Sequence, residues 1–119
     1  MLSNEGCDSV ATFCRAELNP HRAWSLAGGE PEPYLDEADP WQPRQGLPEA
    51  YQLNGGVYAL RIDALPDDEH GLLFGRSGSV LMPPERSIDI DTRLDLHVAR
   101  QLVEGDWVDV EEPTNPPEA

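Results

Sequence analysis

The sequence predicts an α/β fold, because three strand-like segments are followed by one amphipathic helix. The strand segments are Asp8–Cys14, Tyr51–Ile62 and Ser79–Pro83, and each is rich in apolar or β-branched residues. The helix is expected over Arg93–Glu104. A length of 119 residues suits one small domain or part of a larger one.

The helix follows from side-chain spacing and from its first residues. Leu94, Val98 and Leu102 recur at helical spacing and form one apolar stripe. Thr92 is a good N-cap, and Asp95 stands three residues later, as in a capping box. A carboxylate in the first turn also suits the helix dipole.

The segment Tyr51–Ile62 is expected to be a central strand. Its residues are apolar on both alternating faces after Asn54, which is typical of a strand covered on both sides. Gly55 and Gly56 have no side chains, so a ligand or another backbone could approach closely there. A further short strand is expected within Ala23–Gly28.

The chain is expected to form one domain over residues 1–104, with a long proline-rich loop at 28–50. Five prolines between Gly28 and Pro48 exclude a long helix there. Loops of this length are usually functional or disordered. Residues 105–119 form an acidic tail that is expected to be disordered.

Charge excludes two classes of partner. The net charge is −15, and all eight basic residues are arginine. Such a chain repels nucleic acid and anionic membranes. Cys7 and Cys14 are the only cysteines and suggest neither a zinc site nor a disulfide. Without a signal peptide or a long apolar run, we expect a soluble, reduced, cytoplasmic protein.

Two aspartates before the helix, Asp89 and Asp91, are candidate metal ligands. If this segment is extended, both carboxylates lie on one face, while Ile88 and Ile90 point into the core. Mg²⁺ is usually held by one or two carboxylates together with substrate phosphates. The alternative is a capped helix start with a solvated acid pair, and spacing alone favours this alternative.

Three quoted segments together resemble a known family. They are "DSVATFCRAELNPHRAW", "QPRQGLPEAYQLNGGVYALR" and "LMPPERSIDIDTRLDLHVARQLV". Read in order, they resemble the C-terminal half of the acylneuraminate cytidylyltransferases, the CMP-sialic acid synthetases. The resemblance implies a three-layer α/β/α Rossmann-like nucleotidyltransferase fold, of which this chain matches the later strands and the last helix.

The resemblance also implies a reaction. Family members transfer CMP from CTP to a nonulosonic acid and release pyrophosphate, using Mg²⁺. Asp89 and Asp91 match the metal-binding aspartates. Arg44 matches an active-site arginine, Gln45 beside it is an expected substrate ligand, and Arg22 falls where the family often has a lysine.

Asn54 and Tyr58 match family positions near the sugar pocket, and the tyrosine implies a homodimer because it reaches the neighbouring subunit's site. Each residue also has a simpler interpretation. Arg22 and Arg44 could be surface charges, Tyr58 could be a core residue, and Asn54 could follow a turn.

Departures from the family pattern limit the expected function. Gln52 stands where some members carry a second arginine, and Leu72–Phe74 replaces the paired aromatics that some members have at the dimer edge. The resemblance therefore does not decide which nonulosonic acid is the substrate. No lysine- and glycine-rich phosphate loop follows an early strand. The chain is therefore expected to need an N-terminal half or partner subunit. An inactive fragment and a CMP-Kdo-type synthetase are the alternatives.

Overall fold

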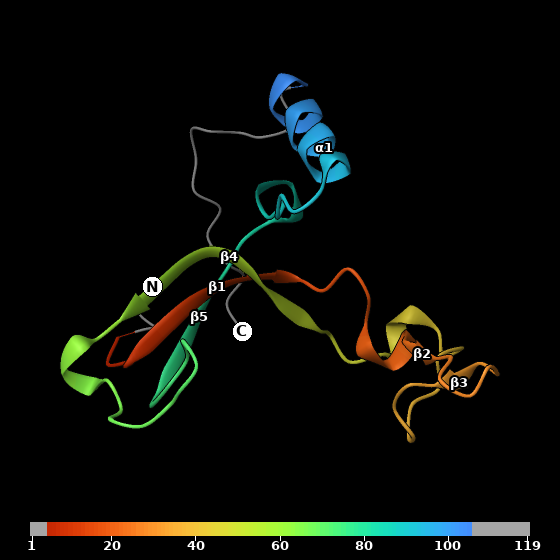
Figure 1. The fold of residues 1–119 in the computed structure, drawn as a ribbon, viewed down its shortest axis with the longest axis horizontal. Coiled ribbons are helices and arrows are strands. Elements are labelled where there is room, and N and C mark those ends of the chain that lie inside the picture. Colours follow the sequence, from red (N-terminus) through yellow and green to blue (C-terminus); the bar gives the residue numbers. More distant parts are fainter. Residues whose placement is uncertain (1–4, 106–119) are drawn as a thin grey trace. The chain divides into compact units, whose positions relative to one another are not determined.

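The structure, a computed structural model, describes residues 5–105 (Figure 1). Its strands are β1 (Ser9–Arg15), β2 (Trp24–Ser25), β3 (Glu32–Pro33), β4 (Tyr51–Leu60) and β5 (Ser77–Leu81), and its α-helix is α1 (Arg93–Glu104). Short 3₁₀ turns lie at η2 (Pro20–Arg22), η3 (Arg44–Gly46), η4 (Ile62–Ala64) and η5 (Pro84–Arg86). The α/β class is confirmed.

The described chain divides into two compact units. Unit 1 consists of residues 5–14 and 53–105, and unit 2 is Arg15–Gln52. No helix in the described part of the chain is long and apolar enough to cross a membrane.

A mixed sheet with the order β4-β1-β5 is the main feature of unit 1 (Figure 1). β1 and β5 are parallel, from Ser9 opposite Ser77 to Phe13 opposite Leu81. β4 runs antiparallel to β1, because the backbone N–H of Arg61, just after β4, donates to the carbonyl of Asp8, just before β1, over 2.9 Å.

The central strand β1 supplies most of the core. Ser9, Ala11, Thr12 and Cys14 are buried on it, and Phe74 joins them from the chain before β5. Ser9 is satisfied although buried, because its hydroxyl donates to the carbonyl of Phe74 over 2.7 Å and accepts the backbone N–H of Phe74 over 2.9 Å. Cys7 and Cys14 are free thiols.

The prediction that Tyr51–Ile62 is a central strand was wrong in its position. The strand forms as β4, but β4 lies at one edge of the described sheet. All its residues except Asn54 are exposed. The apolar pattern is local, whereas the cover of a strand depends on its neighbours, and residues 5–105 supply a neighbour on one side only.

The prediction of α1 is confirmed. Thr92 and Asp95 form a reciprocal capping box, and Gly105 follows the last turn. None of the helix residues is buried, and of the apolar stripe Leu94 and Val98 are exposed and Leu102 is half-buried in the described chain.

Unit 2 contains the strand expected within Ala23–Gly28, which forms as β2, and the proline-rich loop 28–50, within which β3 and η3 are short elements. β2 and β3 pair there in antiparallel register, with Trp24 opposite Pro33, and η3 follows at Arg44–Gly46. The rings of Trp24 and Trp41 pack edge to face with centroids 5.7 Å apart. Of the predicted tail 105–119, residues 106–119 lie outside the described residues.

Candidate functional site

Asp89 and Asp91 lie in the segment that leaves the carboxyl end of β5. The chain leaves β5, turns through η5 and reaches the two aspartates directly before α1. Because β1 and β5 are parallel, their carboxyl ends share one edge of the sheet. The chain that leaves this edge at Leu81 reaches Asp89 eight residues later.

The local backbone differs from the expected strand. Within the described chain, residues 87–91 belong to no helix or strand, so strand alternation does not place the two carboxylates on one face. Ile88 is only half-buried and is not part of the core, and Ile90 is 52% exposed, so the prediction that Ile90 points into the core was wrong. η5 and the helix cap fix this short connection instead of a strand.

Both carboxylates are free for a ligand. Asp89 and Asp91 are exposed, and neither side chain forms a hydrogen bond or ion pair with residues 5–105. No group of three or more His, Cys, Asp or Glu side chains in that range is arranged to hold a metal ion. Two carboxylates suit a Mg²⁺ ion that takes its other ligands from water and substrate phosphates.

Asp95 is occupied by the helix cap. Its Oδ2 accepts the backbone N–H of Asp91 over 3.0 Å and that of Thr92 over 2.9 Å. The hydrogen bond from Asp91 is the main cause that lowers the pKa of Asp95 below its ordinary value, and the bonds from Thr92 lower it further. The cap therefore holds the backbone of Asp91 through one oxygen of Asp95, Oδ2.

Asn54 is the centre of a hydrogen-bond network that also contains Thr12 and Ser87. Its Oδ1 accepts the Thr12 hydroxyl over 2.6 Å and the backbone N–H of Gly56 over 3.0 Å. Its Nδ2 donates to Ser87 Oγ over 3.1 Å and lies 3.2 Å from the sulfur of Met82. Both acceptor positions and both donors of the amide are thus used within the chain.

Tyr58 is not a core residue. It lies on β4, its side chain is exposed, and its hydroxyl forms no hydrogen bond with the described residues. The structure therefore leaves this side chain available to a substrate or a second chain, as the expected role requires.

Arg22, Arg44 and Gln45 belong to unit 2. The guanidinium of Arg22 is half-buried and donates to the carbonyl of Gln42 over 3.0 Å, which ties it to the segment before η3. Arg44 and Gln45 lie on η3, are exposed, and form no side-chain hydrogen bond with residues 5–105. Arg44 is thus the freer of the two cations.

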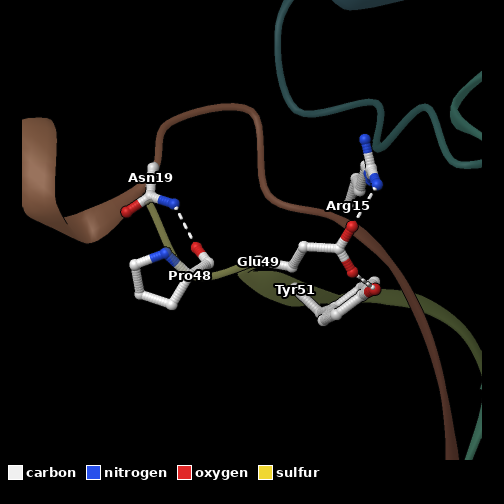
Figure 2. A network of polar contacts seen from close by, with 5 residues as sticks. All are labelled: Arg15, Asn19, Pro48, Glu49 and Tyr51. Atoms are coloured by element: carbon white, nitrogen blue, oxygen red, sulfur yellow. Dashed lines mark hydrogen bonds and ion pairs between the residues drawn. The ribbon is translucent and has the colours of Figure 1, made fainter. Parts of the chain in front are cut away.

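A second network in unit 2 was not predicted from the sequence (Figure 2). Glu49 accepts from Arg15 over 2.7 Å and from the hydroxyl of Tyr51 over 2.8 Å. Nearby, Asn19 Nδ2 donates to the carbonyl of Pro48 over 2.8 Å. The hydrogen bond to Glu49 is the main cause that raises the pKa of Tyr51. The contacts join the first and last residues of unit 2.

The residues that sequence reasoning missed are Thr12, Ser87 and Glu49. Their roles depend on hydrogen bonds to residues 42, 33 and 34 positions away, as in Thr12–Asn54, Asn54–Ser87 and Arg15–Glu49. A single sequence contains no spacing that reports such pairs.

A scan of the chain against models of known protein families finds no match.

Proposed function

We propose that the chain is the metal- and sugar-binding part of a cytoplasmic cytidylyltransferase that transfers CMP from CTP to a nonulosonic acid. The observation that carries the proposal is the segment "SIDIDTRLDL", in which Asp89 and Asp91 are exposed, unpartnered among the described residues, and placed between the carboxyl end of β5 and a capped helix. The ordered resemblance of the other segments supports it.

In this proposal the anomeric hydroxyl oxygen of the sugar attacks the α-phosphorus of CTP. A sugar–oxygen–phosphorus bond forms, the bond from the α-phosphorus to the bridging oxygen breaks, and pyrophosphate leaves, while the hydroxyl proton passes to water. Asp89 and Asp91 would hold Mg²⁺, which would neutralise charge on the triphosphate. Arg44 would pair with a carboxylate or phosphate oxygen of the substrates.

Tyr58 and Gln45 are proposed as substrate ligands. Both side chains are exposed and free of partners among residues 5–105, so each has a hydrogen-bonding group available. Arg22 is proposed to act on the position of η3 as much as on substrate, because its guanidinium is bound to the carbonyl of Gln42. Tyr58 acts on the site of a second subunit in a homodimer.

The direct test is a metal titration followed by a turnover assay. Mn²⁺, used as a paramagnetic probe in place of Mg²⁺, should bind wild-type chain, and Asp89→Asn with Asp91→Asn should abolish that binding. Asp67→Asn with Asp68→Asn is the matched control, since these two acids are also exposed. Pyrophosphate release should then be measured with CTP, Mg²⁺, a panel of nonulosonic acids, and the eight-carbon acid Kdo.

Turnover with nonulosonic acids by the natural full-length polypeptide supports the proposal, and preference for Kdo supports the CMP-Kdo branch instead. A folded protein that neither binds Mn²⁺ through the aspartates nor releases pyrophosphate overturns it.

A non-catalytic half that assembles with a partner is the second candidate. The exposed edge strand β4 favours it, because such an edge can pair with a second polypeptide. The absence of lysine also favours it, because the triphosphate would then be bound by the partner. Turnover by the 119-residue chain alone contradicts this candidate. Turnover that appears only when a second polypeptide is added supports it.

A further inference from the structure

We propose that Ser87 and Asn54 are positioning residues that hold the segment with Asp89 and Asp91 against the sheet; this inference rests on the proposed function. The Asn54 network connects three parts of unit 1 that are distant in sequence. Thr12 is on β1, Asn54 is on β4, and Ser87 follows η5, two residues before Asp89.

Ser87 is the last member of a directed series of hydrogen bonds. The Asn54 amide donates to Ser87 Oγ, and Ser87 Oγ donates to the carbonyl of Pro83 over 2.7 Å. The hydroxyl therefore makes one hydrogen bond within the turn Pro83–Ser87 and one hydrogen bond that connects this turn to β4. Because each member both donates and accepts, loss of one hydroxyl breaks the connection at its centre.

The orientation of Asn54 is fixed from its other side. Thr12 Oγ1 accepts the backbone N–H of Val57 over 2.9 Å and donates to Asn54 Oδ1. Thr12 is buried, so its hydroxyl is held in a fixed environment on the central strand. The amide of Asn54 consequently has one rotation that satisfies all of its partners, with Nδ2 toward Ser87.

The helix cap fixes the same segment from its other end. Asp95 Oδ2 accepts the backbone N–H groups of Asp91 and Thr92, so Asp91 is tied to α1 while Ser87 is tied to β4. Only residues 88–90 lie between these two attachments. The two carboxylates are thereby presented on a short connection anchored at both ends, and they form no hydrogen bond with the anchoring side chains of the described residues.

Removal of a hydroxyl group should reveal this role. Ser87→Ala removes the bonds to Asn54 and Pro83, whereas Ser87→Thr retains the hydroxyl. Ser9→Ala is the control, since Ser9 also donates to a backbone carbonyl over 2.7 Å, but to that of Phe74, outside the Asn54 network. Ser87 bonds to neither carboxylate, so its loss should weaken metal binding by no more than about tenfold, the lower limit for a direct partner of a metal ligand.

The expected result is that Ser87→Ala weakens Mn²⁺ binding by up to about tenfold, while Ser87→Thr and Ser9→Ala bind as wild type does. Equal Mn²⁺ affinity in Ser87→Ala and wild type overturns the inference. So does equal weakening in Ser87→Ala and Ser9→Ala, because that result reports general loss of stability.

Amide hydrogen exchange separates this inference from the proposed function. Ser87→Ala should speed exchange at residues 85–91 and leave residues 73–76 unchanged, and Ser9→Ala should do the reverse. If wild type binds no Mn²⁺, the metal role of the aspartates fails, yet this exchange pattern still shows whether the Asn54 network anchors the segment. Unchanged exchange at residues 85–91 in Ser87→Ala overturns the anchoring itself.

Discussion

Thr12 on β1 and Asn54 on β4 are joined side chain to side chain, with Thr12 Oγ1 2.6 Å from Asn54 Oδ1. Thr12→Val keeps the shape but leaves the backbone N–H of Val57 and one lone pair of Asn54 without their partner. We expect the free energy of unfolding to fall by about 1–3 kcal/mol, because two part-buried hydrogen bonds are lost and each contributes about 0.5–1.5 kcal/mol net. Urea denaturation measures the change. Thr12→Ser retains the hydroxyl and should lose much less.

Gly75 adopts a conformation that other residues avoid. Its φ is +60°, and a Cβ at this position would overlap the carboxylate of Asp8, which accepts the backbone N–H of Arg76. We expect Gly75→Ala to lower the free energy of unfolding by about 1–2 kcal/mol from the backbone alone, with the overlap adding to that cost. Gly71→Ala is the control, because open space surrounds Gly71. Equal thermal stability of the two variants would contradict this prediction.

Tyr51 should titrate above an ordinary tyrosine because it donates to Glu49. Deprotonation of Tyr51 removes the proton of that hydrogen bond and places a negative charge beside the Glu49 carboxylate. Both effects raise the pKa of Tyr51. Glu49→Gln removes the carboxylate charge, and we expect the pKa of Tyr51 to fall toward its usual value.

Ultraviolet titration of the tyrosines checks this, and the difference from Tyr51→Phe identifies the signal among the three tyrosines of the chain. A titration curve that is the same with Glu or Gln at position 49 would show that the pair does not form in solution.

Asp95 gives α1 an acid-dependent cap. Its pKa is lowered in the folded state, first by the backbone N–H of Asp91 and then by Thr92. The ionised cap therefore contributes stability above the ordinary aspartate pKa of about 4, and this contribution is lost as pH falls through the lower folded value. Helicity measured by circular dichroism should decline over that acidic window in wild type.

Asp95→Asn supplies the comparison for the cap, because it has no charge to lose. We expect its helicity to be lower than that of wild type at neutral pH and less dependent on pH between about 2 and 5. Parallel pH curves for both proteins would contradict an ionised cap.

Local features of the fold could be predicted from the sequence, and non-local ones could not. α1 was predictable because its cap and apolar stripe lie within fourteen consecutive residues, Thr92 to Gly105. The position of β4 was not, because a strand's own residues do not tell how many neighbours it has.

In the candidate site, too, local features could be predicted from the sequence and non-local ones could not. The exposed pair Asp89 and Asp91 stands out as a motif, but the hydrogen bond from Asn54 to Ser87 joins residues 33 positions apart. Ile90 was placed wrongly because the alternation rule holds only for a strand, and this segment is fixed by a turn and a cap.

We expect the isolated chain to self-associate, because β4 is an edge strand with exposed side chains in the described sheet. β4 contains no charged residue in ten, and Leu53, Val57 and Tyr58 are exposed on it. Long, uncharged edge strands pair with other chains, and charges on the edge prevent this. We expect sedimentation velocity to show oligomers whose population grows with protein concentration, despite the net charge of −15.

Val57→Lys should reduce this association because it places a charge on the edge strand. Ile62→Lys is the control, since Ile62 is also exposed but lies on η4, just after β4. The two variants add the same charge to the chain, so a difference between them reports the edge strand and not the net charge. A wild-type chain that stays monomeric at high concentration and unfolds in one cooperative transition would contradict the prediction, because a β4 that needs a neighbour from another chain should not be stable alone.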